Sequence, residues 1–292
     1  MPAHDLKLLE DSVRAAGAIA REIAARDFQT KNKTDGSPVT EADLAVNTYL
    51  NGALRGARPE YAWLSEENED DKSRFSAPRV FVVDPIDGTL AFVRRRPHFT
   101  ICVAVVENEL PITAAVYNPM TEECFTAAKG HGAFLNGSRI HVTERDSLDG
   151  CRMLASKSTL TSPRWTPWPD MHVEIPNSIA YRLALVACGK FDAAITMAEL
   201  HDWDIAAADL ILTEAALPDG SWLDVLQLAR EYPHATEVIV TDPQADARFW
   251  AEALNLGAYD LLAQPFYEPE VRRILFNACS RPPSQSSHGA AS

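Results

Sequence analysis

Two carboxylates stand close together at the end of an apolar run in the sequence. The segment VFVVDPIDGT, residues 80–89, has Asp84 at the end of the run and Asp87 shortly after it, followed by Gly88 and Thr89. Carboxylates this close repel each other unless a cation lies between them, and hard divalent ions such as Mg²⁺ prefer oxygen ligands. The residue types and their spacing therefore favour a divalent metal site at this position.

The two residues after Asp87 suggest a second element of the same site. Gly88 lets the backbone approach a ligand, and we expect the amides of Gly88 and Thr89 to open the next helix, where free N–H groups bind phosphate. The alternative is an ordinary Asx-type turn with Asp-Gly at its corner, which needs no ligand. The segment alone does not separate these two interpretations.

Two further acidic clusters occur elsewhere in the chain. WLSEEN at 63–68 ends another strand-like run in Glu66 and Glu67, and HDWDIAAAD at 201–209 places Asp204 at a predicted helix start. The simpler interpretations are a solvated charge run for the glutamates and helix N-capping for the aspartate. Three acidic clusters in one chain nevertheless favour a shared metal site.

The overall charge limits the classes of partner. The chain of 292 residues has a formal net charge of −14, so broad electrostatic binding to nucleic acid or anionic lipid is not expected. The N-terminal segment is amphipathic and acidic, unlike a signal peptide, and no apolar run has the roughly 20 residues of a membrane span. Five scattered cysteines without a C-x-x-C pair argue against disulfides and structural zinc, and predict a reducing, cytoplasmic setting.

The hydrophobic pattern predicts the elements that position these residues. Apolar residues spaced three and four apart predict an amphipathic helix over 5–27, and Thr40 followed by Asp43 indicates a capped helix start. Short runs rich in Val, Ile, Phe and Tyr over 61–135 predict a largely antiparallel sheet. Residues 156–172 are expected to be rich in loops. Three later elements are predicted in the order helix, strand, helix: NSIAYRLALVACG, FDAAITM and WDIAAADLILTEA.

The three acidic motifs, taken together and in this order, resemble the inositol monophosphatase family of magnesium-dependent, lithium-sensitive phosphatases. That family's pattern is an EE pair, then D-P-I-D-G-T, then W-D-x-A-A; VTEAD at 39–43 and KGHGAFLNG at 129–137 match two more of its elements. The resemblance covers residues 5–215 and implies an α/β fold, an αβαβα layered sandwich. It implies Mg²⁺ ligands at the following positions: Glu66, Asp84, the Ile86 carbonyl, Asp87 and Asp204.

The resemblance also implies how the reaction proceeds. Thr89, with Glu66 and Asp43 nearby, would orient a water molecule for in-line attack on phosphorus, without a covalent enzyme intermediate. The substrate phosphate would contact Asp87 and the amides of Gly88 and Thr89. The substrate class is a small phosphorylated metabolite, and the resemblance points to a homodimer.

The choice among the family's substrates, which include inositol phosphates, 3'(2'),5'-bisphosphorylated nucleosides and sugar bisphosphates, is less constrained. Inositol enzymes have an acidic residue seven positions before the W-D aspartate, where this chain has Met197. SIAYRLALVACG is similar to bacterial members labelled bisphosphate nucleotidase, which favours substrate contacts from Tyr181 and Arg182. The basic run at Arg94, Arg95 and Arg96 either binds a second phosphate or is a solvated loop.

The family pattern breaks after WDIAAADLILTEA. Residues 209–278 instead resemble the second half of a response-regulator receiver domain, with strand and helix alternating as in parallel β-α units. Its phosphoacceptor position holds Glu214 and its usual lysine is Gln264, so phosphorylation is not expected. The overlap DLILTEA is predicted to be helical, as Asp204 requires. The alternatives to an active phosphatase are a catalytically impaired chimera and a non-enzymatic receiver-like signalling or scaffold protein.

These observations predict the domain organisation. The expected parts are a phosphatase-like α+β domain at 1–150, a hybrid α/β domain at 151–279 (phosphatase-like to 215, receiver-like from 216), and a disordered tail at 280–292.

Overall fold

The computed structural model describes most of the first 216 residues and two short strands beyond them. The described ranges are 2–34, 36–70, 72–145, 147–161, 169–196, 200–216, 239–242 and 260–263. The chain forms two compact units, Met1–Pro218 and Asp219–Ser292. Met197 and Gln264, on which two of the sequence arguments depend, lie outside the described residues.

The first unit begins with helices and a large set of strands. In chain order these elements are α1 (Pro2–Ala24), β1 (Thr30–Asn32), β2 (Pro38–Thr40), α2 (Glu41–Ala57), β3 (Ala62–Ser65), η1 (Ser73–Phe75), β4 (Val80–Asp87), α3 (Thr89–Val93), β5 (Thr100–Glu107), β6 (Leu110–Asn118), β7 (Glu123–Ala128), β8 (Gly132–Leu135) and β9 (Ser138–Arg139). The rest of the unit contains β10 (Arg152–Ala155), α4 (Lys157–Leu160), β11 (His172–Glu174), α5 (Ile179–Ala187), β12 (Ala193–Ile195) and α6 (Asp202–Ala216). The helix predicted over 5–27 and the helix start at Thr40 are confirmed.

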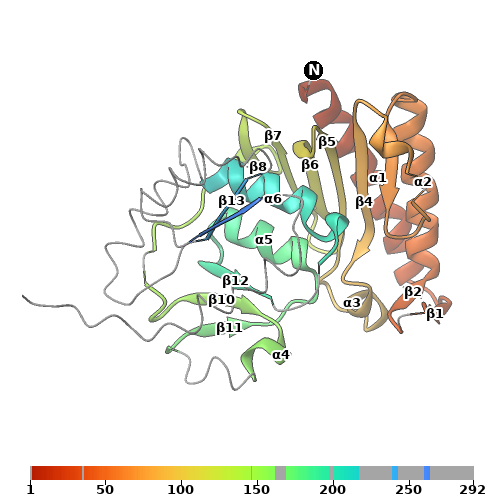
Figure 1. Ribbon diagram of the computed structural model, residues 1–292. Helices are drawn as coiled ribbons and strands as arrows, with labels where there is room; N and C mark the ends of the chain where they lie inside the picture. The colour runs from red at the N-terminus through yellow and green to blue at the C-terminus, as the bar shows by residue number, and fades with distance from the viewer. Residues whose placement is uncertain are drawn as a thin grey trace, which may run out of the picture. The chain divides into compact units, whose positions relative to one another are not determined.

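A seven-stranded sheet is the centre of the first unit (Figure 1). Its strands lie in sequence order from β3 to β9, as expected of a meander whose short turns join neighbours. Every pair is antiparallel except β3 with β4, which is parallel. The largely antiparallel sheet predicted over 61–135 is therefore confirmed.

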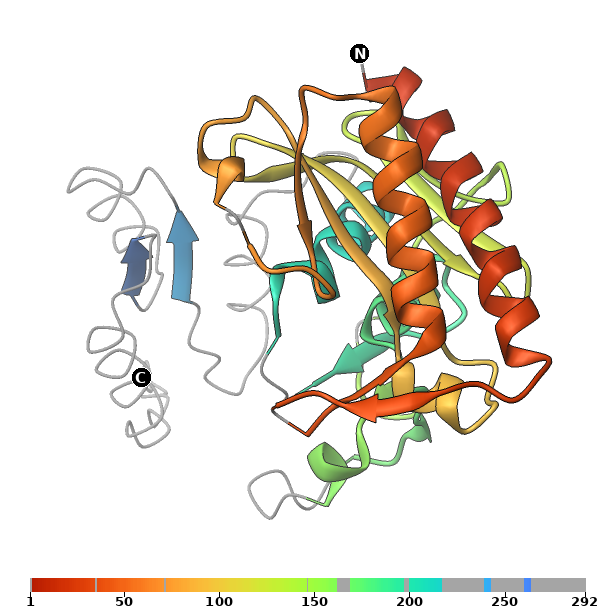
Figure 2. The ribbon, with the colours of Figure 1, turned by 90° about the vertical axis from the view of Figure 1, so that its right-hand side faces the viewer.

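Helices cover both faces of this sheet because its central strands are apolar on both sides. Along β4, Phe81 and Val83 pack with α1 and α2, whereas Val82 belongs to the cluster on the opposite face with α5 and α6. This is the two-residue alternation of a strand, with a hydrophobic partner on each side. Figure 2 shows α1 and α2 lying side by side over one face.

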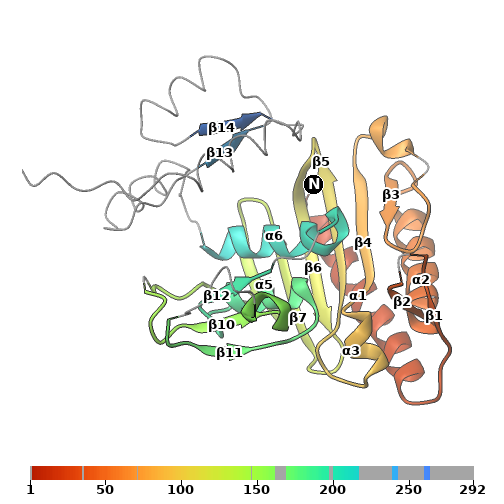
Figure 3. The same cartoon turned by 60° about the horizontal axis from the view of Figure 1, so that its bottom comes forward.

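A second, three-stranded parallel sheet lies beyond α5 (Figure 3). β10 is its central strand, between β11 and β12, and buried Cys151, Met153 and Ala155 form its small core. The unit is therefore layered as helices, sheet, helices and sheet, a mixed α/β architecture. The boundary expected at residue 150 falls between β9 and β10, where one sheet ends and the next begins, and it stays a prediction.

α6 includes the overlap segment DLILTEA, which the sequence predicted to be helical rather than a receiver strand. The helix continues to Ala216, and its inner face buries Ala208 and Ile211 against the large sheet. Near its end the Glu214 carboxylate accepts hydrogen bonds from the amides of Gly130 and Gly132, both 2.8 Å, in the turn between β7 and β8. The helical prediction is confirmed, and Glu214 has a structural partner.

The second unit contains two described strands, β13 (Ile239–Asp242) and β14 (Asp260–Ala263). They pair in parallel, with Ile239 opposite Asp260 and Asp242 opposite Ala263. This agrees with the parallel β-α units predicted over residues 209–278; the helices expected there and the tail at 280–292 lie outside the described residues. In the part of the chain that the structure describes, no helix is both long and apolar enough to span a membrane.

Candidate active site

The two aspartates of DPIDGT are buried at the end of β4. Asp84 is 2% exposed and Asp87 is 7% exposed, and the pairing with β5 shifts register between them, which makes room for both side chains. Burial raises the pKa of Asp84, and the charges of Asp87, Glu66 and Asp204 raise it further. Four of the predicted ligands are therefore close enough to repel one another.

Asp87 is held by the N-terminal end of α5. Its carboxylate accepts hydrogen bonds from Ser178 Oγ at 2.6 Å, the Ala180 amide at 2.7 Å and the Ile179 amide at 3.3 Å. Burial nevertheless raises the pKa of Asp87 to about 6, because these hydrogen bonds only partly offset the lost hydration. Thr100 Oγ1 lies 2.9 Å from Ser178 Oγ, so the Ser178 hydroxyl links Asp87 to the first residue of β5.

Gly88 is required where β4 turns into α3. Its φ is +91°, and a Cβ there would lie 2.9 Å from the carbonyl oxygen of His98 and 3.1 Å from the Ser178 amide nitrogen. Because both of these atoms belong to the backbone, neither can move aside easily. The turn therefore brings the backbones of three segments close together at Gly88, where a side chain would not fit.

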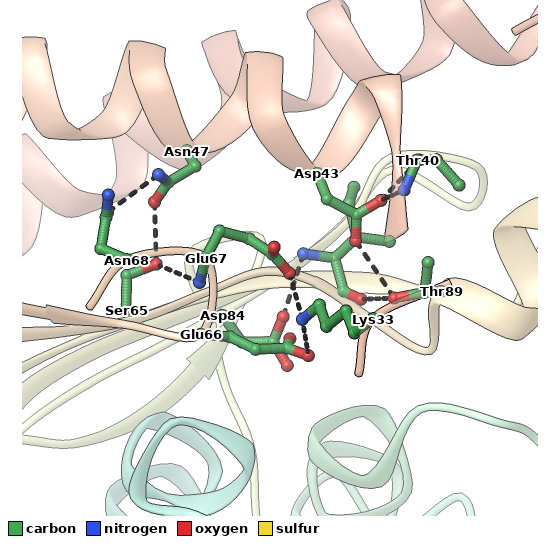
Figure 4. A network of polar contacts seen from close by, with 11 residues as sticks. Lys33, Thr40, Asp43, Asn47, Ser65, Glu66, Glu67, Asn68, Asp84 and Thr89 are labelled. Carbon is green, nitrogen blue, oxygen red and sulfur yellow. Dashed lines mark hydrogen bonds and ion pairs between the residues drawn. The ribbon is translucent and has the colours of Figure 1, made fainter. Parts of the chain in front are cut away.

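Thr89 and Asp43 meet as the sequence predicted. Thr89 Oγ1 lies 3.1 Å from Asp43 Oδ1 and 3.0 Å from the Ile86 carbonyl oxygen, both acceptors (Figure 4). Asp43 also closes the capping box of α2, accepting hydrogen bonds from the Thr40 amide and hydroxyl. Burial raises the pKa of Asp43, although these hydrogen bonds oppose the shift.

Lys33 contacts both glutamates of the acidic pair, an interaction the sequence analysis missed. Its Nζ lies 2.7 Å from Glu66 Oε1 and 2.7 Å from Glu67 Oε1 (Figure 4). Burial alone would lower the pKa of Lys33, but the hydrogen bonds and charges of the two glutamates raise it overall. A basic residue ten positions before Asp43 was the available signal, but no local pattern links it to residues 66 and 67.

Asp204 lies in the first turn of α6. Its carboxylate accepts a hydrogen bond from the His201 amide at 2.7 Å. This is the contact that an acidic residue in the first turn makes back to the residue preceding the helix, so Asp204 is not itself the N-cap that the simpler interpretation supposed. Burial raises the pKa of Asp204, and the charge of Glu66 adds to the shift, so the residue also lies within electrostatic range of the predicted metal ligands. The imidazole of His201 stacks on Trp203 beside it, with 4.9 Å between ring centroids.

The donor set fits a hard divalent cation, because it consists of carboxylate and carbonyl oxygens that repel one another in a buried place. Among the described residues, however, no group of three or more Asp, Glu, His and Cys side chains is arranged to hold a metal ion as it stands. Asp87 is turned to α5 and Glu66 to Lys33. The predicted ligand set therefore stays a prediction.

The predicted substrate contacts differ in their surroundings. Arg94, Arg95 and Arg96 are all exposed, and Arg95 also donates to the carbonyls of Ala24 and Arg26 at the end of α1. The buried Tyr181 hydroxyl donates to Glu123.

Arg182, the other predicted contact on α5, is 6% exposed. It donates from Nε to the Pro176 carbonyl at 2.7 Å, and burial lowers its pKa. Its Nη1 is buried with no hydrogen-bond partner among the described residues.

Buried Asp84 and Asp87 next to the Thr89–Asp43 pair, within layered sheets and helices, are the arrangement expected of a metal-dependent phosphohydrolase. The profile of the inositol monophosphatase family matches residues 2–256, and this chain belongs to that family. The match continues past the junction expected at 209–216. It confirms the prediction of a phosphoric monoester hydrolase of this family.

Known relatives are similar over most of their length. An inositol-1-monophosphatase of Rhizobium meliloti is 33% identical over 228 residues, 74% of this chain and 84% of that protein. The Nus factor SuhB of Escherichia coli is 30% identical over 223 residues, 71% and 82% of the two chains. The crystal structure of SuhB from Bartonella henselae has a TM-score of 0.66 at 27% identity, covering 73% of this chain and 85% of that chain. The Thermotoga maritima IMPase also has a TM-score of 0.66, at 30% identity, covering 74% and 84%.

Proposed function

We propose that this protein is a Mg²⁺-dependent phosphomonoesterase acting on a small phosphorylated metabolite. The observation that carries the proposal is the contact of the Thr89 hydroxyl with Asp43, immediately after buried Asp84 and Asp87. A hydroxyl held in this way next to a cluster of carboxylates is suited to orient a water molecule beside a bound cation.

The proposed metal ligands are Glu66, Asp84, the Ile86 carbonyl, Asp87 and Asp204. Bound Mg²⁺ supplies a coordinated water of lowered pKa and neutralises charge on the phosphoryl oxygens. Mutual repulsion of the carboxylates supports the assignment, since a cation relieves it.

The residues around the proposed ligands orient the reactants. Thr89, donating its hydrogen bond to Asp43, keeps a lone pair that would accept a hydrogen bond from the attacking water, and Glu66 would help to orient the same water. The amides of Gly88 and Thr89, with Asp87, position the substrate phosphate for in-line attack.

An observation on α5 supports a substrate with a second anionic group. The Nη1 of Arg182 is buried without a partner, and a buried guanidinium donor left unpaired is unfavourable until an acceptor arrives. A phosphate oxygen is a suitable acceptor for arginine. We therefore place a 3'(2'),5'-bisphosphate nucleotide ahead of an inositol monophosphate as the substrate, with Arg94 and Arg96 as further contacts.

The test is phosphate release from adenosine 3',5'-bisphosphate and inositol 1-phosphate, measured side by side with and without Mg²⁺. We expect Mg²⁺-dependent release that lithium inhibits and that is lost in Asp87→Asn. A folded protein that releases no phosphate from either compound would refute the assignment and favour the non-enzymatic alternative.

We further propose that the second unit is a receiver-like replacement for the closing elements of a phosphatase, joined to them between residues 209 and 216. The separation of the two units after Pro218 and the parallel pairing of β13 with β14 support this hybrid. The hybrid retains the phosphatase portion through α6, including Asp204. A melt with two separable transitions, one assigned to each unit by limited proteolysis, would support it; one transition shared by both units would count against it.

The cellular setting belongs to the same proposal. The four cysteines in the described part of the chain are free, which agrees with a reducing, cytoplasmic compartment. A homodimer is proposed from the family resemblance and is tested by sedimentation velocity.

A further inference from the structure

Two polar side chains are buried one helical turn apart on α2. Asp43 is 1% exposed and Asn47 is 6% exposed. Residues four apart lie on the same face of a helix, and here that face is turned toward the end of β3 and the start of α3 (Figure 4). Asp43 contacts Thr89, whereas Asn47 contacts a different part of the site.

Asn47 binds the residues that bracket the glutamate pair. Ser65 Oγ donates to Asn47 Oδ1 at 2.8 Å, and Asn47 Nδ2 donates to Asn68 Oδ1 at 2.9 Å (Figure 4). Ser65 directly precedes Glu66, and Asn68 directly follows Glu67. One amide group on α2 therefore fixes both ends of this turn.

The turn has supporting contacts that depend on the same residues. The backbone N–H of Asn68 donates to the backbone carbonyl of Ser65 at 3.2 Å, and Trp63 Nε1 donates to the side-chain oxygen Oδ1 of Asn68 at 2.9 Å. The Glu66 amide continues the pairing with β4 by donating to Val83 O at 3.2 Å. A buried amide with both its donor and its acceptor engaged holds one orientation, because any other leaves polar atoms unpaired.

We propose that Asn47 is a positioning residue for the metal site: by holding Ser65 and Asn68 at the two ends of the turn, it directs the carboxylate of Glu66 so that it can bind Mg²⁺. The same helix then positions the water through Asp43 and the metal through Asn47. This inference rests on the proposed function. Partners of metal ligands commonly alter metal affinity by about 10- to 100-fold when they are lost.

The test is Mg²⁺ binding to the full chain by isothermal titration calorimetry, which does not depend on turnover. Asn47→Ala removes both contacts and is expected to weaken Mg²⁺ affinity about 10- to 100-fold. Asn47→Asp still accepts from Ser65 but faces Asn68 Oδ1 with a second acceptor, so we expect a smaller loss.

Arg58→Met is the matched control from the other end of α2. Arg58 Nε donates to buried Asp5 at 2.9 Å, so this variant should lower the melting temperature without changing Mg²⁺ affinity. It separates loss of stability from loss of positioning.

The outcomes distinguish this inference from the proposed function. If the wild type binds Mg²⁺ and Asn47→Ala and Asn47→Asp bind it equally well, the positioning role is wrong and the phosphatase assignment stands. If Asn47→Ala does not fold, Asn47→Asp decides the matter by the same measurement. A wild type that binds no Mg²⁺ overturns both.

Discussion

Two helices, α2 and α5, contact the end of β4 and the residues just after it, and the hydrogen bonding of their buried polar groups differs. On the α2 side, the Asp43 carboxylate accepts from Thr40 and Thr89, and the amide of Asn47 is engaged at both its oxygen and its nitrogen. On the α5 side, Asp87 is also well bonded, but Arg182 keeps a buried nitrogen without a partner. The buried polar groups of Asp43 and Asn47 on the α2 side thus have hydrogen-bond partners within the protein, whereas Arg182 on the α5 side lacks one for Nη1.

This difference assigns separate tasks to the two sides. Groups that orient water and metal ligands need to be fixed before the substrate arrives, as the α2 side is. A group that recognises the substrate is instead satisfied by the substrate itself, as Arg182 would be. The predictions that follow test this division, from the largest expected effect to the smallest.

Asp84→Asn changes a proposed metal ligand at the end of β4, between the α2 side and the α5 side. We expect kcat/KM to fall about 1,000-fold, or about 4 kcal/mol, because a charged metal ligand is lost. The metal-free protein should melt at the same or a higher temperature, since the neutral amide removes repulsion with Asp87. Phosphate release and thermal melts check the two parts, and activity within tenfold of wild type would show that Asp84 is not a ligand.

The pH dependence of stability tests the α5 side. Asp87 has a pKa of about 6 in the folded protein against an ordinary 3.8, so between these values the folded state holds more protons than the unfolded state. Stability of the metal-free protein should therefore fall as pH rises through this window, with at most about 3 kcal/mol contributed by Asp87. Asp43, Asp84 and Asp204, whose pKa values are also raised, add to the same slope. Urea titrations at several pH values measure this slope. Asp87→Asn should reduce it by the Asp87 share; an unchanged slope would assign it to the other groups.

Lys33→Met tests the glutamate pair that Asn47 of α2 holds through Ser65 and Asn68. Without Lys33, two half-buried carboxylates repel each other, and we expect the metal-free free energy of unfolding to fall by about 1–2 kcal/mol, given partial exposure. Excess Mg²⁺ should reduce this deficit, because the cation replaces the ammonium group. Chemical denaturation with and without Mg²⁺ is the measurement. An equal deficit in both conditions would mean that the metal binds elsewhere.

Arg182→Met should change substrate preference. We expect KM for adenosine 3',5'-bisphosphate to rise about tenfold, or about 1.4 kcal/mol, with KM for inositol 1-phosphate unchanged. Arg95→Met is the control, since Arg95 donates to backbone carbonyls at the end of α1 and should alter stability only. Equal changes in KM for both substrates would show that Arg182 does not bind a second anionic group of the substrate.

Local patterns were sufficient to predict much of the frame. The apolar run before Asp84, the Thr40–Asp43 spacing and the helical character of residues 203–215 each depend on neighbouring residues, and each is confirmed. Short runs rich in Val, Ile, Phe and Tyr over 61–135 were enough to predict a largely antiparallel sheet.

The contacts between distant residues could not be predicted in this way. Lys33 with Glu66, and Asn47 with Asn68, connect loops and helices whose spacing has no period to detect. Arg95 shows the converse: a basic run predicted as a phosphate contact includes a side chain that donates to backbone carbonyls at the end of α1. Local sequence gives charge and propensity, whereas the partner of each charge is decided by tertiary packing.

The clasp between Glu214 and the two glycine amides gives α6 an anchor at the end opposite Asp204. A helix that is fixed near its C-terminal end keeps its N-terminal residues, here Asp204, in the same place whatever sequence follows the fixed end. The described part of α6 is thus secured to the β7–β8 turn before the chain leaves the first unit. We therefore expect the position of Asp204 to depend on this anchor more than on the sequence that follows Pro218.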